Sequence, residues 1–328
     1  MPTPKISVII PVFNSKKYLR TCLESVTAAI NKYGAAELIL VDNGSTDGSY
    51  EILLSDYRNI ARIHQIGGVT ISALRNLGAR LAQGEYLSFI DSDCVIPKDY
   101  FHSAMAVFST RKADAAGCYY SLPEAPSWIE ETWDNINRRG VNTYVPYLFS
   151  GNLLIKKSVF EKVGGFNEEL ITGEDAELGL RLNASGFKIF ATPDITAVHL
   201  GNPKTLGQFF RKHTWHGLGM FGSLKVSWKD KPLLATFTHL FFTTLGLMNV
   251  FVPWVTLSIR IAALLLLSVS VPAVAVAYRA AKRGGTYRPL RSVLLYHIYF
   301  SARVWALFKL VIYRTRGHVR PQNAYPRR

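Results

Sequence analysis

Two carboxylates stand two residues apart in the segment FIDSDC, at Asp91 and Asp93. They directly follow YLSFI at 86–90, an apolar run with the composition of a buried strand. Ligands of open α/β sheets bind at the carboxyl ends of the strands, so this position favours a binding role. Carboxylate oxygens are typical ligands of Mg²⁺ or Mn²⁺, which bridge to substrate phosphates. The alternative is that Asp91 caps the next segment and Asp93 is only solvated, and the spacing alone does not decide between them.

Two further polar turns follow predicted strands: PVFN at 11–14 and VDNGSTDG at 41–48. Predicted helices at 16–32 and 71–84 separate these strands, and each helix has an apolar face with helical spacing. This alternation predicts an α/β fold with a mostly parallel sheet covered on both faces. The carboxyl ends of parallel strands share one edge, so we expect the three turns to converge into a composite pocket.

The charge of the chain is distributed unevenly. Of 328 residues, 38 are Lys or Arg and 23 are Asp or Glu, which gives a formal net charge of +15. Residues 231–328 contain 14 of the basic residues and no acid, so the preceding part is nearly neutral. Nucleic-acid binding needs a basic face on a folded domain, whereas this excess flanks apolar segments. We therefore expect no nucleic acid as a partner and attribute the excess to attraction by anionic lipids of a membrane.

Two apolar segments in the basic region are long enough to cross a bilayer. Residues 233–252 form an uncharged run of about 20 residues, and 261–277 form a run of 17. Pro253, Trp254 and Arg260 lie between them, which suits a turn with an aromatic interface anchor. We predict a transmembrane hairpin over 233–280. A buried hairpin in a soluble protein is the alternative.

Basic residues flank both ends of this predicted hairpin, and only Arg260 lies in its turn. By the positive-inside rule both ends face the cytoplasm, which predicts a multi-pass protein of the cell inner (cytoplasmic) membrane. The flanking residues are Arg211, Lys212, Lys225, Lys229 and Lys231 before the hairpin and Arg279, Lys282, Arg283, Arg288 and Arg291 after it.

A third apolar stretch at 293–313 is interrupted by His297, Arg303 and Lys309. We predict a basic amphipathic helix on the membrane surface, so that 281–328 form an interfacial helix and tail. Residues 223–232 are expected to be a juxtamembrane linker.

The cysteines and the first residues also bear on the setting of the protein. Cys22, Cys94 and Cys118 show no metal-binding spacing and fit a reducing compartment. PKISVIIPVF at 4–13 is expected to open a strand rather than to form a signal peptide.

Five blocks occur in order along the chain: SVIIPVFN, ILVDNGSTDGS, ALRNLGARLAQGEYLSFIDSD, GNLLIKKSVFEKVGGFNEEL and GEDAELGLRL. Their order over about residues 6–215 resembles the family 2 glycosyltransferases. The resemblance implies a GT-A, Rossmann-like catalytic domain at 1–222. It also implies a nucleotide-diphosphate sugar as donor and inversion of the anomeric configuration.

The resemblance carries expected roles for the donor site. Asp91 is expected to face the ribose and Asp93 a Mn²⁺ or Mg²⁺ ion, with Asp91 as a further metal ligand. Asp42 could instead be a simple turn former, and Arg75 an exposed helix residue. The nucleotide-binding residues implied by the resemblance are Pro11, Val12, Phe13, Asn14, Asp42, Asn43, Arg75, Asn76, Asp91 and Ser92.

Asp175 in GEDAELGLRL matches the catalytic base of the family. A base accepts the proton of an acceptor hydroxyl as that oxygen attacks the anomeric carbon. The alternative is that Glu174 and Asp175 only enrich the first turn of a helix, where acids suit the dipole. His199 is expected to complete the metal site, although a lone His beside apolar residues is often structural. The remaining candidates for donor-sugar or acceptor contacts are Gly151, Asn152, Glu174, Arg211 and Trp215.

These inferences predict a membrane-anchored, metal-dependent, inverting hexosyltransferase with its catalytic domain in the cytoplasm. The donor is expected to be a UDP-sugar and the acceptor a hydroxyl of a lipid-linked or membrane-proximal glycan, as in polysaccharide biosynthesis of the cell envelope. The base favours a hydroxyl over a polyprenyl phosphate, which is already anionic and is the alternative acceptor. A non-catalytic membrane assembly subunit is a more remote alternative. The C-terminal region could also mediate homo-oligomer formation.

Overall fold

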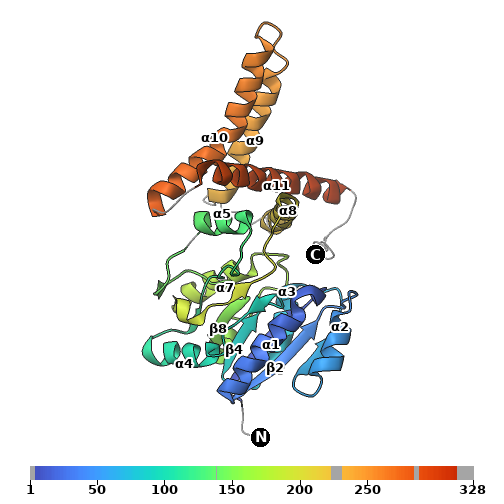
Figure 1. The fold of residues 1–328 in the computed structure, drawn as a ribbon, viewed down its shortest axis with the longest axis vertical. Coiled ribbons are helices and arrows are strands. Elements are labelled where there is room, and N and C mark those ends of the chain that lie inside the picture. Colours follow the sequence, from blue (N-terminus) through green and yellow to red (C-terminus); the bar gives the residue numbers. More distant parts are fainter. Residues whose placement is uncertain (1–3, 138, 223–230, 284–287, 316–328) are drawn as a thin grey trace. The chain divides into compact units, whose positions relative to one another are not determined.

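The computed structural model describes residues 4–137, 139–222, 231–283 and 288–315 (Figure 1). Contacts divide the described residues into two compact units. Unit 1 comprises 4–124 and 139–202, and unit 2 comprises 125–137 and the described residues from 203 onward. This grouping places residues 203–222 with the C-terminal helices, whereas the predicted catalytic domain ends at 222. The functional division into domain, linker, hairpin and tail stays a prediction, and much of the linker and tail lies outside the described residues.

Unit 1 is built on an eight-stranded sheet in the order β3-β2-β1-β4-β8-β6-β9-β7. Strands β3, β2, β1 and β4 pair in parallel, as do β6 and β9, which confirms the predicted mostly parallel sheet. Strands β8 and β7 run antiparallel to their neighbours. The strands are β1 (Ile6–Val12), β2 (Ala36–Asp42), β3 (Arg62–Gln65), β4 (Tyr86–Ile90), β6 (Ala115–Gly117), β7 (Thr143–Tyr144), β8 (Asn152–Lys156) and β9 (Ile189–Ala191). A separate ribbon pairs β5 (Cys94–Val95) with β10 (Val198–His199).

Helices cover both faces of this sheet, as the continuous apolar strands predict. Alternate residues of β1 divide between two cores: Val8 packs with α1 (Lys16–Tyr33) and α4 (Tyr100–Thr110). Ile9 packs with α3 (Ile71–Leu81), α6 (Lys157–Lys162) and α7 (Glu174–Ala184). The short helix α2 (Ser49–Ile52) follows β2. Because both faces are buried, the sheet leaves only its strand ends for a ligand site.

The antiparallel strand β8 determines which residues reach the edge where β4 ends. Asn152, the first residue of β8, pairs with Ile90, the last residue of β4. The Asn152 side chain is fully buried and donates hydrogen bonds to the carbonyls of Cys118 and Ile195. It also accepts a hydrogen bond of 2.6 Å from the Tyr100 hydroxyl. Asn152 therefore joins three segments beneath the carboxyl end of β4.

Unit 2 consists of five helices in its described residues: α5 (Trp128–Asn137), α8 (Leu206–Gly222), α9 (Lys231–Asn249), α10 (Leu257–Arg283) and α11 (Pro289–Thr315). Ser127 and Glu130 begin α5 with a reciprocal capping pair, since each backbone N–H donates to the other's side chain. Helices α9 and α10 pack along each other, and α11 crosses them and packs on α8 (Figure 1).

Two helices of unit 2 are long and apolar enough to cross a membrane: 257–282 in α10, with mean hydropathy 2.3, and 289–312 in α11, with mean hydropathy 1.2. This differs from the prediction in two ways. Helix α9, which contains most of the predicted first span, does not pass the same test. The stretch predicted as interfacial lies in α11, which does pass it.

The turn between α9 and α10 holds Arg260 by backbone contacts. The guanidinium donates hydrogen bonds to the carbonyls of Val250, Pro253 and Val255. Arg260 lies in the first turn of α10, and its side chain provides donors for these carbonyls of the segment between the two helices. The position of Arg260 thus has a structural cause that is separate from membrane orientation.

We expect Asn152→Ala to destabilise unit 1 by at least about 2 kcal/mol, because it leaves two buried carbonyls and the Tyr100 hydroxyl without their partner. Amide hydrogen exchange of β6 and β8 in the full-length protein should accelerate by about 30-fold, since each 1.4 kcal/mol corresponds to a factor of ten. The matched control is Asn59→Ala, at an exposed position, where the change should stay within about 0.5 kcal/mol. Unchanged exchange in Asn152→Ala would show that these hydrogen bonds do not hold the sheet edge.

Candidate functional site

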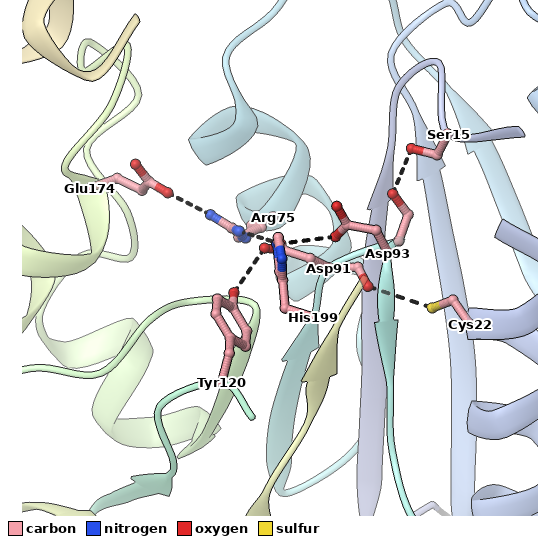
Figure 2. Close-up of polar contacts among 9 residues, drawn as sticks. Ser15, Cys22, Arg75, Asp91, Asp93, Tyr120, Glu174 and His199 are labelled. Carbon is pink, nitrogen blue, oxygen red and sulfur yellow. Dashed lines mark hydrogen bonds and ion pairs between the residues drawn. The ribbon is translucent and has the colours of Figure 1, made fainter. Parts of the chain in front are cut away.

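The three predicted turns meet at one edge of the sheet. The hydroxyls of Ser15 and Ser92 lie 2.7 Å apart, which joins the turn after β1 to the turn after β4 (Figure 2). The turns after β1 and β2 are joined as well, because Asn14 N donates to Ser45 Oγ and Thr46 N donates to Asn14 Oδ1. The predicted convergence of these turns is confirmed. Asn14 adopts a φ of 48°, a left-handed conformation that Asn tolerates better than most residues.

Asp42 stabilises the turn that follows β2. Its carboxylate is fully buried and accepts hydrogen bonds from Ser45 and from Gln65 Nε2. This is the turn-forming alternative, and it leaves no exposed carboxylate surface for a base or ribose. The expected contact of Asp42 with the nucleotide stays a prediction. Pro11 and Val12 likewise lie buried within β1, and Phe13 is partly buried beside the turn.

Two further amide side chains expected at the nucleotide are also structural clamps. Asn43 bonds both the N–H and the carbonyl of Val69. Asn76 bonds both the N–H and the carbonyl of Phe166, and also Glu168. Because their amides bond backbone groups, these side chains have a structural role here, and their expected contact with the nucleotide stays a prediction. They shape the loops around the site instead.

Arg75 lies at the centre of the site, with its side chain 2% exposed. One guanidinium nitrogen donates to Asp91 Oδ1 at 2.7 Å and another donates to Glu174 Oε1 at 2.8 Å (Figure 2). The alternative of an exposed helix residue is therefore wrong. Burial alone would lower the pKa of Arg75, but the Asp91 and Glu174 carboxylates raise it above its ordinary value. A permanently charged Arg75 thus links the end of β4 to the start of α7.

Asp91 has both carboxylate oxygens engaged. Oδ1 accepts from Arg75, and Oδ2 accepts from the Tyr120 hydroxyl at 3.0 Å. Gly151 lies against this pair, and a Cβ there would overlap both the carboxylate and the hydroxyl. The expected role of Asp91 as a metal ligand stays a prediction, in which a metal would share the carboxylate with these two donors. Its side chain is 22% exposed, which leaves part of it facing solvent.

Asp93 has a different set of neighbours. His199 Nε2 lies 3.5 Å from Asp93 Oδ1, and both side chains are almost fully buried. The β5–β10 ribbon brings them together, because it pairs His199 with Cys94, the residue after Asp93. One ligand atom from each of Asp93, Cys94 and His199 lies within 4.8 Å of the others. Carboxylate and imidazole at this separation fit a divalent cation, as predicted for Asp93 and His199.

Asp175 lies in the first turn of α7, next to Glu174. Its Oδ1 accepts from the N–H of Ala176 at 2.7 Å. Burial and the Glu174 carboxylate raise the pKa of Asp175 to about 7, although Arg75 and Arg139 act to lower it. A pKa near neutrality suits a group that takes up a proton during a reaction. Arg75 contacts one oxygen of Glu174, Oε1, and the expected contact of Glu174 with a sugar stays a prediction.

Three residues in the site were not anticipated from their sequence context. The Tyr120 ring packs against His199, with ring centroids 4.6 Å apart, while its hydroxyl holds Asp91. Arg139 stacks on Tyr147, with its guanidinium carbon 4.7 Å from the ring centroid, and donates to that hydroxyl. Cys94 directly follows the DSD segment, and this adjacency is the one sequence feature that could have placed it in the site. Tyr120 and Arg139 carry no motif that indicates their position.

The structure does not bring all predicted site residues together. The Asn152 side chain is buried beneath β4 and bonds protein groups, and its expected contact with a sugar stays a prediction. Gly151 borders Asp91 through its backbone. Arg211 and Trp215 lie on α8 in unit 2, and their expected contact with donor or acceptor stays a prediction.

Comparison with known proteins identifies the family. Residues 7–164 match the model of "Glycosyl transferase family 2", and residues 86–312, more than half of the chain, match "Glycosyl transferase family group 2". Glycosyltransferase AglE of Haloferax volcanii is 28% identical over 66% of this chain and 73% of its own length. Glycosyltransferase GlyA of Streptococcus pneumoniae is 35% identical over 40% of this chain, a match that spans only 21% of GlyA.

A solved structure shares the fold. Mannosyltransferase PcManGT from Pyrobaculum calidifontis, in complex with GDP-Man and Mn²⁺, superposes with a TM-score of 0.59. The likeness covers 94% of this chain and 87% of that chain at 17% identity, so it speaks to the fold alone. Together with the family match, these findings show that the chain belongs to glycosyl transferase family group 2 and has the GT-A fold.

Proposed function

We propose that this glycosyltransferase transfers a sugar from a nucleotide-diphosphate donor to a hydroxyl group by a single inverting displacement. The acceptor hydroxyl loses its proton to Asp175 while its oxygen bonds to the anomeric carbon and the nucleotide diphosphate leaves. One observation supports this most strongly: Asp175 lies in the first turn of α7 beside Glu174, which Arg75 connects to Asp91, and burial and the Glu174 carboxylate raise the pKa of Asp175 to about 7. The Arg75 ion pairs thus hold the proposed base at the start of α7 at a fixed distance from Asp91, which we propose faces the donor.

We further propose that Mn²⁺ or Mg²⁺ assists the reaction, held by Asp93 and His199. The cation would supply positive charge to the leaving diphosphate. The structural neighbour PcManGT was solved with GDP-Man and Mn²⁺, which supports a nucleotide sugar and a divalent cation here. A UDP-sugar is the donor we test first, followed by GDP- and dTDP-sugars.

Membrane anchoring through unit 2 is part of the proposal. Many apolar side chains of α10 are exposed, including Leu266 at 73% and Val274 at 69%, and the apolar windows of α10 and α11 are mostly unburied. Such surfaces are unfavourable in water and suit lipid. We propose that α10 crosses the membrane together with α9, which packs along it as a hairpin, and that α11, which crosses this pair, lies in the interface with its basic residues at anionic headgroups. This arrangement supports a lipid-linked acceptor at the cytoplasmic face.

The decisive experiment supplies full-length protein with each nucleotide sugar, Mn²⁺ or Mg²⁺ and a membrane lipid extract, and measures release of nucleotide diphosphate. We expect release with one donor and none after chelation of the cation. The absence of release with every donor and acceptor would contradict the proposal.

Asp175→Asn should lower the transfer rate by about 10²- to 10⁴-fold, because the amide cannot accept the proton of a hydroxyl acceptor. The control is Glu169→Gln, an exposed acid in unit 1 that should leave the rate unchanged. Full activity of Asp175→Asn would instead favour an acceptor that is already anionic, such as a polyprenyl phosphate.

The pH dependence should report the charges around Asp175. Protonated Asp175 cannot act as a base, so the rate should fall as the pH drops through about 7. Glu174→Gln removes a negative charge, which should lower the pKa of Asp175 and shift this acidic limb of the pH–rate profile to lower pH by about one pH unit. Arg75→Gln removes a positive charge, which should raise the pKa of Asp175 and shift the acidic limb to higher pH.

These opposite shifts distinguish a charge effect from general damage, because damage would lower the rate without moving the limb in two directions. Arg80→Gln, at an exposed position on the same helix as Arg75, is the matched control and should not move the limb. Shifts in the same direction for both variants would refute the assignment of Asp175 as the titrating base.

A further inference from the structure

The DSD segment is followed by a thiol that the GT-A metal site does not require. Cys94 is fully buried beside Asp93, and its sulfur is one of three ligand atoms that lie within 4.8 Å of one another. The other two come from Asp93 and His199. Cys94 and His199 are directly opposite each other on the antiparallel β5–β10 ribbon. Directly opposite residues point to the same face of such a ladder, with Cβ atoms about 5 Å apart, which explains why sulfur and imidazole converge.

The dimensions fit a four-coordinate cation with nitrogen, oxygen and sulfur ligands. Bonds of about 2.0 Å to nitrogen and oxygen in a tetrahedral site separate these atoms by roughly 3.3 Å. The observed distance from His199 Nε2 to Asp93 Oδ1 is 3.5 Å. The sulfur is no more than 4.8 Å from either partner, so closure around an ion needs a movement of about 1 Å.

The groups around Asp93, Cys94 and His199 restrict which further ligands a bound cation could take. Asp91 cannot readily supply a further oxygen, because Arg75 and Tyr120 hold its carboxylate. Magnesium prefers six oxygen ligands and keeps several waters, which matches this buried mixed donor set poorly. Zinc, cobalt and cadmium accept a thiolate and an imidazole together and need only one more ligand, which a phosphate or water could provide.

We propose that Cys94 is a third protein ligand, so that Asp93, Cys94 and His199 form a site for borderline-soft divalent cations such as Zn²⁺. In binding, the thiol loses its proton to solvent as the metal–sulfur bond forms. Occupancy by Zn²⁺ would place a tightly held ion where the proposed Mn²⁺ or Mg²⁺ acts. The inhibitory consequence rests on the proposed function, whereas binding itself does not.

Cobalt provides a direct test, because a cobalt–thiolate bond produces a charge-transfer absorption band that oxygen and nitrogen ligands do not. Full-length protein in detergent, stripped of metal with a chelator, is titrated with Co²⁺ alone. We expect a saturable thiolate band in the wild type and its loss in Cys94→Ser. Cys118→Ser removes another buried thiol outside the cluster and should keep the band.

The affinity for Zn²⁺, measured by displacement of Co²⁺, should fall by at least about 10-fold in Cys94→Ser, since even loss of groups that only support a metal ligand has such an effect. Because Cys94→Ser could fold poorly, the ¹¹³Cd resonance of the wild type provides a measurement that needs no variant: one sulfur ligand is expected. A cobalt spectrum without a thiolate band, a band that persists in Cys94→Ser, or a cadmium shift without sulfur would overturn the inference.

The outcome is separable from that of the proposed function. Release of nucleotide diphosphate with Mn²⁺ but no thiolate band would overturn only the role of Cys94. A thiolate band without release for any donor would contradict only the proposed transfer reaction.

Discussion

The buried guanidinium of Arg75 is the interaction on which the site depends. It lies between Asp91, 16 residues away in sequence, and Glu174, 99 residues away. Removing one member of a buried ion pair typically costs about 3–5 kcal/mol, because the remaining charge is left without compensation. Arg75 therefore fixes the separation between the strand end that faces the donor and the helix that begins beside Asp175. The reactive groups are far apart in sequence but are connected by hydrogen bonds to one cation.

The same network explains why two aspartates in one short segment have different environments. Asp91 faces Arg75 and the Tyr120 hydroxyl, which commits both its oxygens to the protein. Asp93 is two residues further on and faces the β5–β10 ribbon, where His199 lies. Two carboxylates in a segment of three residues can thus have different partners, a guanidinium for Asp91 and an imidazole for Asp93.

The C-terminal unit obeys a different constraint. Helices α8 to α11 carry basic residues and no acid, and many apolar side chains of α9, α10 and α11 are exposed, which are the two features that the proposed membrane anchoring would satisfy. Arg260 is held by carbonyls of the α9–α10 turn, which shows that a charge near an apolar helix can have a purely local function. Hydropathy and charge counts therefore identified which part of the sequence forms this apolar, basic region, but they did not correctly assign which of its helices pass the test for a membrane span.

The sequence by itself determined the alternating strands and helices, the family, and the edge at which Asp91 and Asp93 lie. The strands, the helices and the edge follow from apolar periodicity and strand ends, which are properties of short segments, whereas the family follows from the resemblance of five ordered blocks. Only the tertiary structure decided that Asn76 and Asn152 are internal clamps, and that Arg75 joins two carboxylates. An amide or guanidinium can bind either a ligand or the protein itself. The choice depends on the groups that folding brings close, such as Glu174, which is 99 positions from Arg75. A local sequence pattern does not indicate such distant neighbours.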